Sequence, residues 1–419
     1  MRILVATDQW FPDVRGGVAR IAAETADRLA AAGHAVTVIA PRSAALPRFD
    51  DHGNRRLLRV VPRNAFPRTL LDAPATWYAA RRLGGAFDVV VGHSPSASVG
   101  VSEALPDLPL VHVFHASPAR EARLVRATVS PAQKLATFPL EPILTRLERR
   151  ALQSAATIFV LSEYSAGLVR QRESTAATRT EIVPAGVDTD VFQPGDGQES
   201  ARRRLGLPPG LRLLVAVRRL DAALGLEQLI AAVELLDDDV LLAIVGAGPL
   251  ESKLRARAWG LGDRIDFRGE SADAAVADWY RAADLFVLPP APHEGFGLAT
   301  VEALACGTPA VGVASGATPE VLGPLDERLV APSADARVFA RTLRDGLELA
   351  ASPPFRERCR AYALARFSWK AAAGEWERRL AAVALERPRQ NAVSTLGCDE
   401  VPARGARART ANRTHREDS

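Results

Sequence analysis

Cysteine and lysine are both scarce in this sequence of 419 residues. The three cysteines are odd in number and widely spaced, so they build neither a disulfide framework nor a zinc site. This usage is typical of a protein from a reducing compartment. No cluster of histidine and cysteine suggests another metal site. The cysteines are Cys306, Cys359 and Cys398, and the lysines are Lys134, Lys253 and Lys370.

Long apolar runs are missing as well. No run approaches the roughly 18–20 residues of a transmembrane helix. The opening segment, MRILVATDQW, lacks the charged, apolar and cleavage regions of a signal peptide. We therefore expect a cytoplasmic protein. A hydrophobic content of 47% with 24% charged residues is ordinary for a globular protein, and the length favours two domains.

The charge balance gives little sign of a nucleic-acid partner. The net charge is only +4, and part of the positive excess lies in residues 386–419. Arginine occurs there among Ser, Thr, Asn and Gly without a hydrophobic period, so we expect a disordered tail. A nucleic-acid-binding tail is the alternative, but we predict that no nucleic acid is bound.

Short apolar runs alternate with helical patterns along the rest of the chain. The runs lack polar alternation, as expected for parallel strands buried on both faces of a sheet. Strand–helix–strand repetition indicates the doubly wound α/β class. Residues 18–32 carry apolar positions at helical spacing, with Gly33 as a C-cap. The predicted strands are 3–7, 35–40, 87–91, 110–114 and 157–161, and then 213–217, 240–245, 264–267, 285–288 and 310–313.

A loop-rich stretch at residues 194–197 separates the two series of strands. We predict an N-terminal Rossmann-like domain over residues 1–195, completed by a C-terminal helix at about 366–385. A second Rossmann-like domain is predicted over residues 196–365. Each domain would bind ligands at the carboxyl ends of its strands, and two such domains facing each other form a cleft.

The most informative stretch is HEGFGLATVEALACGTP, at residues 293–309. A strand leads into a glycine-containing loop and then into a helix that is expected to begin near Leu298. The free N–H groups of such a helix start can bind a diphosphate. Glu294 and Glu302 can each accept hydrogen bonds from sugar hydroxyls, one from a hexose and one from a ribose. The alternative is that Glu302 only complements the helix dipole and Glu294 is a solvated loop residue.

Through this stretch the chain resembles the group-1 (family 4) retaining GT-B glycosyltransferases. The E-x7-E element from Glu294 to Glu302 is that family's most specific mark. The resemblance extends from MRILVAT to about Leu385. Supporting segments are GGV at 16–18, FHASPARE at 114–121, VLSEYS at 160–165, VPAGVD at 183–188, VRRLDAALGLEQL at 217–229, VGAGP at 245–249 and YRAADLFVLP at 280–289.

The resemblance implies a GT-B fold, with two Rossmann-like domains facing across a cleft. It also implies metal-independent transfer of a hexose from a nucleotide-diphosphate sugar, with retention of configuration and without a cofactor. The implied catalytic residues are His115, Arg219 and Glu294. The implied donor-binding residues are Gly16, Gly17, Arg218, Gly246, Gly248, Arg268, Gly295, Phe296, Gly297, Leu298, Ala299 and Glu302.

Several of these roles have a plain chemical reason. Arg219 would stabilise the charge that grows on the departing diphosphate, and Arg218 can share or exchange that role. His115 would hydrogen-bond the hexose, and its backbone carbonyl would face the developing positive charge. The alternative is a core histidine at a strand end. His93 and Glu121 are the acceptor-side candidates, for an acceptor that is a sugar, a lipid or a small molecule.

The chain departs from the family pattern at two positions. The family usually has a lysine five residues after the diphosphate-binding arginine, where this chain has Leu224. Some branches with arginine-arginine-leucine also have an apolar residue there. The second departure is Ala185, which stands in place of an asparagine. The loss of the lysine motivates a non-enzymatic alternative, a silent nucleotide-sugar-binding scaffold.

Two short motifs are interpreted as structural. Asp188-Thr189-Asp190 spells the D-x-D of metal-dependent transferases, but it lies in the interdomain connection. Gly246-Ala247-Gly248 begins like a dinucleotide fingerprint, but Glu251 stands where the third glycine belongs. The broken fingerprint disfavours a dehydrogenase. A GT-B sugar-nucleotide epimerase would share the fold, although the E-x7-E layout favours transfer.

A basic, partly apolar region between Arg120 and Arg150 predicts a peripheral contact with the inner face of a membrane. The alternative is an ordinary solvated helical face. The basic residues in this region are Arg120, Arg123, Arg126, Lys134, Arg146, Arg149 and Arg150.

Overall fold

The first half of the chain builds an eight-stranded sheet around the strands that the apolar runs predict. In this computed structural model the strand order is β3-β4-β2-β1-β5-β6-β7-β8. Neighbouring strands pair in parallel except for β3 and β4, which are antiparallel. The strands are β1 Arg2–Ala6, β2 Ala35–Arg42, β3 Phe49–His52, β4 Arg55–Pro62, β5 Val89–Gly92, β6 Leu110–Phe114, β7 Thr157–Val160 and β8 Thr180–Ile182.

The structure describes residues 1–42, 46–62, 68–84, 87–128, 140–221, 224–291 and 294–386. The predicted disordered tail therefore lies almost wholly outside the described residues. The sequence missed three strands of this sheet: β3 and β8, which lie at its two edges, and β4, which lies next to β3. β3 and β4 form a hairpin around Gly53, whose φ of 57° is in the left-handed region. Their charged residues hide the pattern of a buried strand.

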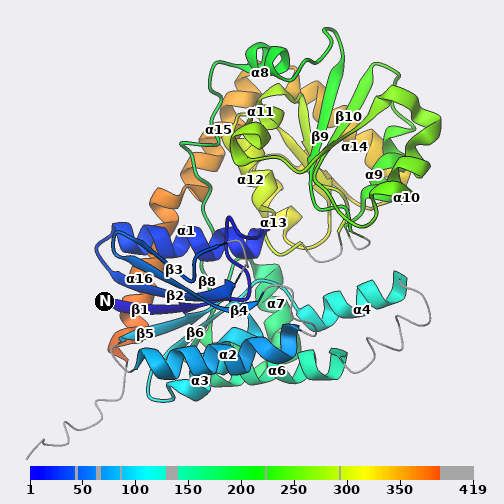
Figure 1. Cartoon of the computed structure of the whole chain (residues 1–419). Coiled ribbons are helices and arrows are strands. Elements are labelled where there is room, and N and C mark those ends of the chain that lie inside the picture. The colour runs from blue at the N-terminus through cyan, green and yellow to red at the C-terminus, as the bar shows by residue number, and fades with distance from the viewer. Residues whose placement is uncertain are drawn as a thin grey trace, which may run out of the picture. The chain divides into compact units, whose positions relative to one another are not determined.

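Helices cover both faces of the first sheet. Figure 1 shows α1 and α16 on one face and α2, α3 and α6 on the other. α1 begins at Gly17 and ends at Ala31, within one residue of the prediction, and Gly33 follows it with a φ of 91°. The helices of this half are α1 Gly17–Ala31, α2 Arg68–Leu83, α3 Pro95–Ala104, α4 Pro118–Thr128, α6 Leu140–Ser154 and α7 Glu163–Arg172.

The second half builds a six-stranded parallel sheet in the order β11-β10-β9-β12-β13-β14. Its strands are β9 Arg212–Val217, β10 Val240–Val245, β11 Ile265–Gly269, β12 Leu285–Val287, β13 Ala310–Val313 and β14 Val330–Ala331. Its helices are α8 Gln198–Arg204, α9 Leu226–Val233, α10 Glu251–Ala258, α11 Asp273–Ala282, α12 Leu298–Ala305, α13 Thr318–Leu322 and α14 Ala336–Ala350. Two parallel-sheet Rossmann-like domains are thus present.

Two C-terminal helices follow, α15 Pro353–Phe367 and α16 Trp369–Leu385. α16 packs on α1 and β5 of the first half. Its buried Trp376 donates from Nε1 to the carbonyl of Pro184 at 3.3 Å and meets Phe159 edge-on at 5.3 Å. The last helix therefore ties the end of the described chain to the first sheet.

Candidate active site

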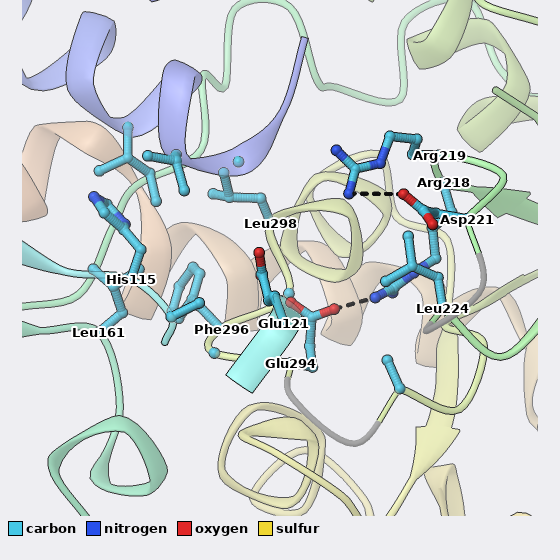
Figure 2. A pocket seen from close by; sticks show the side chains of 17 residues that line it. His115, Glu121, Leu161, Arg218, Arg219, Asp221, Leu224, Glu294, Phe296 and Leu298 are labelled. Atoms are coloured by element: carbon cyan, nitrogen blue, oxygen red, sulfur yellow. Dashed lines mark hydrogen bonds and ion pairs between the residues drawn. The ribbon is translucent and has the colours of Figure 1, made fainter. Parts of the chain in front are cut away.

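A cavity of about 240 Å³ lies between the strand ends of the first sheet and those of the second. Loops and helix starts of both halves form its wall (Figure 2). Most of the predicted site residues lie in this wall, although they are spread over the sequence from Gly17 to Leu298. The lining residues are Gly17, Val18, Ile21, His115, Ala116, Glu121, Leu161, Arg218, Arg219, Asp221, Leu224, Ala291, Glu294, Gly295, Phe296, Gly297 and Leu298.

The start of α12 forms one wall of the cavity. Gly297 has a φ of 86°, a left-handed conformation that favours glycine, and the helix begins at Leu298 as the sequence predicts. Within the described part of the chain, the N–H groups of residues 297–299 donate to no protein acceptor. Free N–H groups at a helix N-terminus attract an anion. Ala299 carries one of them, although its side chain does not line the cavity.

Gly17, at the start of α1, lies opposite this helix. A Cβ added to Gly17 would stand 3.6 Å from Cδ1 of Leu298, so the two helix starts lie close together. Gly16 does not line the cavity, and its φ of 167° is extended backbone that any residue adopts. Of the predicted glycine pair, only Gly17 therefore borders the ligand space.

The two neighbouring arginines occupy different environments. Arg218 has a side chain only 12% exposed, and its Nη1 lies 3.0 Å from Oε2 of Glu294. Its Nε is buried and has no hydrogen-bond partner among the residues that the structure describes. Arg219 is 68% exposed, and its Nη2 lies 3.3 Å from Oδ2 of Asp221. Figure 2 shows both ion pairs. Arg218 therefore holds Glu294 inside the cavity, whereas Arg219 stands in its more open part.

Leu224 lines the same wall as the arginines. The family resemblance predicts a lysine at this position, whereas Leu224 contributes an apolar side chain to the cavity. Among the lining residues that the structure describes, the cations are Arg218 and Arg219. Arg218 is thus a second cation in the cavity wall beside Arg219, and it pairs with Glu294.

His115 lies at the end of β6 and is paired with His93, which follows β5. Nδ1 of His93 and Nε2 of His115 are 3.0 Å apart, and the rings stack at 5.3 Å. Burial, together with the nearby His112, lowers the pKa of His115 to about 3. Burial also lowers the pKa of His93. Both rings are therefore neutral near pH 7, and His115 offers hydrogen bonds rather than a positive charge.

His93 does not line the cavity. Its ring lies between His115 and Trp376 of α16, with the Trp376 ring nearly parallel at 6.3 Å. Nε2 of His93 and Nδ1 of His115 are buried, and neither has a hydrogen-bond partner within the described part of the chain. His93 would therefore act on an acceptor in the cavity only indirectly, through its contact with His115.

Glu121, on the first turn of α4, lines the cavity on the side of the first sheet. Desolvation by the surrounding protein raises the pKa of its carboxyl, although the side chain is exposed, and the charge of Arg219 opposes that shift. A carboxylate beside an arginine in an open cavity can accept hydrogen bonds from hydroxyl groups. Its position fits the predicted acceptor side.

Glu302 does not line the cavity, because its carboxylate is engaged with other protein groups. The hydroxyl of Tyr280 donates to Oε2 at 3.0 Å, and Nε of Arg20 lies 3.6 Å from Oε1. Arg20, on α1, also pairs with Asp273 of α11 at 2.6 Å. The second carboxylate of the E-x7-E element therefore takes part in a polar network between the two halves. Its contact with a ribose stays a prediction.

The buried state of Glu302 predicts a pH-dependent stability. Burial raises its pKa from 4.5 to about 7, although Arg20 opposes the shift. The folded protein therefore binds the Glu302 proton more tightly than the unfolded chain does. The stability gained from this protonation is fully present below pH 4.5 and is lost as the pH rises through 7. Relative to Glu302→Gln, the wild type should lose on the order of 1–3 kcal/mol of unfolding free energy from pH 5 to 8. Urea unfolding at several pH values measures this loss. If the unfolding free energies of the two proteins change equally from pH 5 to 8, the assignment is contradicted.

Three other predicted donor residues lie outside the cavity lining. A Cβ on Gly246 would stand 2.0 Å from the carbonyl oxygen of Arg218, and one on Gly248 would stand 2.3 Å from that of Leu220. These glycines let two loops pack closely behind the arginines. Arg268 pairs with Asp266 and lies over the Trp279 ring at 5.0 Å.

Sequence reasoning missed several lining residues. Asp221 follows the arginine pair directly, so its position could have revealed it as a partner of Arg219. The others are small or apolar, and no chemical motif distinguishes them from core residues. They are Val18, Ile21, Ala116, Leu161 and Ala291.

Asp188 of the D-x-D motif takes part in local structure. Its Oδ1 accepts from the N–H of Asp190 at 3.0 Å, and its Oδ2 lies 3.5 Å from Nη2 of Arg28. Among the residues that the structure describes, no three His, Cys, Asp or Glu side chains gather as a metal site. Within the same residues, no helix combines the length and apolar character needed to cross a membrane.

Two family models cover most of the chain. Residues 15–191 match glycosyltransferase family 4, and residues 197–366 match the glycosyl transferases of group 1. A D-inositol 3-phosphate glycosyltransferase of Streptomyces bingchenggensis is 30% identical over 64% of this chain and 60% of its own length. The match thus spans less than two thirds of that relative. D-inositol 3-phosphate glycosyltransferase 1 of Catenulispora acidiphila is 31% identical over 72% of this chain and 75% of its own.

A solved structure with a similar backbone is sucrose-phosphate synthase from Thermosynechococcus elongatus. The TM-score is 0.75 at 22% identity, over 91% of this chain and 100% of that chain. At this identity the similarity shows the fold alone. Fold and cavity together define a GT-B protein, whose two Rossmann-like domains face each other across a ligand cavity. The chain belongs to the group-1 (family 4) glycosyltransferases.

Proposed function

We propose that this protein transfers a hexose from a nucleotide-diphosphate sugar to an acceptor hydroxyl, with retention of anomeric configuration. The observation that carries the proposal is the wall of the cavity around α12. Free N–H groups of residues 297–299 and the buried, unpartnered Nε of Arg218 belong to the same small region. Such donors suit a diphosphate, whose negative charge increases as the sugar departs.

The proposed mechanism is a substitution on one face of the sugar. An oxygen of the donor phosphate takes the proton of the acceptor hydroxyl, while the acceptor attacks from the face that the leaving group vacates. The protein orients the two substrates and stabilises charge. Glu294 would bind hexose hydroxyls, neutral His115 would donate or accept one hydrogen bond, and Arg219 would meet the charge of the diphosphate.

For the acceptor, a phosphorylated polyol is the first compound to test, because two relatives carry the name D-inositol 3-phosphate glycosyltransferase. Glu121 faces the cavity from α4 and would bind an acceptor hydroxyl. Sugars and lipids with a free hydroxyl are the other acceptor classes.

A two-stage experiment tests this function. A thermal-shift screen of nucleotide sugars first selects the donor that raises Tm most. Transfer is then followed with inositol phosphates, sugars and lipid extracts, and NMR reads the anomeric configuration of the product. A retained anomer supports the proposal, and an inverted anomer contradicts the mechanism. Binding without transfer or hydrolysis favours the silent scaffold, and interconversion of the donor sugar favours an epimerase.

Transfer should not need a metal ion. The motivation is that Asp188 serves a local turn and an ion pair with Arg28. Activity after exhaustive dialysis against EDTA should equal that of the untreated enzyme within about two-fold. Loss of turnover that magnesium or manganese restores would contradict metal independence.

We also propose that the protein is cytoplasmic and touches an anionic membrane with the α2–α6 side of its first half. A groove there is lined by Pro74, Trp77, Ile143 and Leu147, with Arg146 and Arg150 beside them. Trp77 is 40% exposed. Apolar side chains flanked by arginines suit the interface of an anionic bilayer. Lys134 of the predicted basic region lies outside the described residues.

Co-sedimentation with vesicles tests this contact. At low salt the protein should pellet with vesicles that contain phosphatidylglycerol, and not with pure phosphatidylcholine. The double variant Arg146→Ala/Trp77→Ala should pellet at least about five-fold less, because it loses one charge and one interfacial aromatic side chain. Equal pelleting of both proteins would contradict the assigned surface.

A further inference from the structure

Glu148, on α6, is a carboxylate that the transfer chemistry does not use. It is 1% exposed and does not line the cavity. Its carboxylate accepts from the hydroxyl of Ser117 at 2.8 Å and from the N–H of Ala119 at 2.7 Å. Nε of Arg172, on α7, lies 3.0 Å from its Oε2. A buried charge thus joins α6 and α7 to the loop in front of α4.

The same groups fix the first turn of α4. Oγ of Ser117 accepts from the N–H of Arg120 at 3.2 Å and from Nη2 of Arg172 at 3.1 Å. The carbonyl of Ser117 accepts from the N–H of Glu121 at 3.0 Å. Glu148 therefore holds one end of the turn whose other end carries Glu121.

The opposite side of this segment contacts the donor-side loop. A Cβ on Gly295 would stand 2.7 Å from the carbonyl oxygen of His115, so the two backbones touch. Segment 115–121 is thus held between Gly295 on one side and Glu148 with Arg172 on the other. A shift of its anchor would move both the His115 carbonyl and the Glu121 carboxylate within the cavity.

Stability alone does not account for this ion pair. A buried ion pair loses hydration, and an apolar pair of similar volume is often equally stable. A charged pair that donates and accepts several directed hydrogen bonds instead fixes the backbone in one place. The geometry of Ser117, Ala119 and Arg172 around one carboxylate has this character.

We propose that Glu148 and Arg172 are positioning residues for the acceptor side of the transfer site. They set the place of Glu121 on the acceptor side and, through the same segment, that of the His115 carbonyl at the reaction centre. The donor side depends on α12 and Arg218, which none of these hydrogen bonds involves. This inference rests on the proposed function.

The test compares four variants with the wild type, using the donor and acceptor found in the screen. Glu148→Gln removes the charge but keeps the shape, and Glu148→Leu/Arg172→Met replaces the pair by apolar side chains. Arg172→Lys keeps the charge. Glu141→Gln is the control, because Glu141 also joins α6 to α4 through Arg123, away from the first turn.

Glu148→Gln and the double variant should raise the acceptor KM about ten-fold and lower kcat. The Kd for the nucleoside diphosphate, measured by calorimetry, should stay within two-fold, and so should the donor KM. Arg172→Lys should retain most of the wild-type activity, and Glu141→Gln should match the wild type. Hydrogen exchange at the amides of residues 119–121 should quicken in the double variant, even where its Tm equals that of the wild type.

Two results would overturn the positioning role. One is an unchanged acceptor KM in folded Glu148→Gln and in the folded double variant. The other is an equal loss of donor and acceptor binding, which indicates a general loss of fold. If the wild type itself transfers nothing with any donor, the proposed function fails first and the positioning role fails with it. The wild-type assay thus distinguishes the two failures.

Discussion

Replacing Arg219 by alanine should lower kcat about 100- to 1000-fold and raise the donor KM far less. The charge that Arg219 meets grows in the transition state, so its loss affects the chemical step more than binding. Leu224 stands where the family usually has a second cation. Among the lining residues that the structure describes, only Arg218 and Arg219 are positively charged. Steady-state kinetics with saturating acceptor measures this split between kcat and KM.

Arg218→Ala tests the neighbouring position. Its side chain is mostly buried and pairs with Glu294, so its removal leaves a carboxylate without its partner. We expect a loss of activity here too, with a larger rise in donor KM than in Arg219→Ala. If Arg218→Ala is crippled and Arg219→Ala equals the wild type, Arg218 alone is the diphosphate cation. If neither variant loses activity, the phosphate site lies elsewhere and the silent scaffold gains support.

Leu224→Lys adds a complementary variant. Leu224 lines the cavity beside both arginines, so a lysine there would point its charge at the same ligand space. The variant should be as active as the wild type or somewhat more active. Combined with Arg219→Ala, it should restore part of the lost kcat.

Glu294→Gln should lower kcat/KM about 10- to 100-fold and leave the fold intact. A hydrogen bond from a sugar hydroxyl to a charged carboxylate contributes about 1.5–3 kcal/mol, and glutamine keeps the shape without the charge. Glu251→Gln is a matched control, because Glu251 also pairs with an arginine, Arg255, but lies outside the cavity lining. The control should retain wild-type kinetics.

A double-mutant cycle refines the assignment of Glu294. The effects of Glu294→Ala and Arg218→Ala should be strongly non-additive, because the two side chains form one ion pair at 3.0 Å. Glu294→Ala and Arg219→Ala should be closer to additive, since Arg219 pairs with Asp221 instead. Normal kcat/KM in folded Glu294→Gln would exclude Glu294 from hexose binding.

The family pattern of the E-x7-E element was a good guide to one carboxylate and an incomplete guide to the other. Glu294 lies in the cavity wall, as its place before a helix start predicts. Glu302 instead meets Tyr280 and Arg20, which are 22 and 282 positions away in sequence. Periodicity cannot predict such partners, because they depend on how α1 and α12 pack together.

The sequence by itself determined the class of this fold and the start of α12. Uninterrupted apolar runs specify buried parallel strands, and Gly297 permits the left-handed turn before α12, because both are local preferences of the backbone. Only the tertiary structure decided which arginine is enclosed, that His93 stacks on His115, and that Glu148 anchors α4. Those outcomes depend on side-chain directions and partners that come together only when distant segments pack.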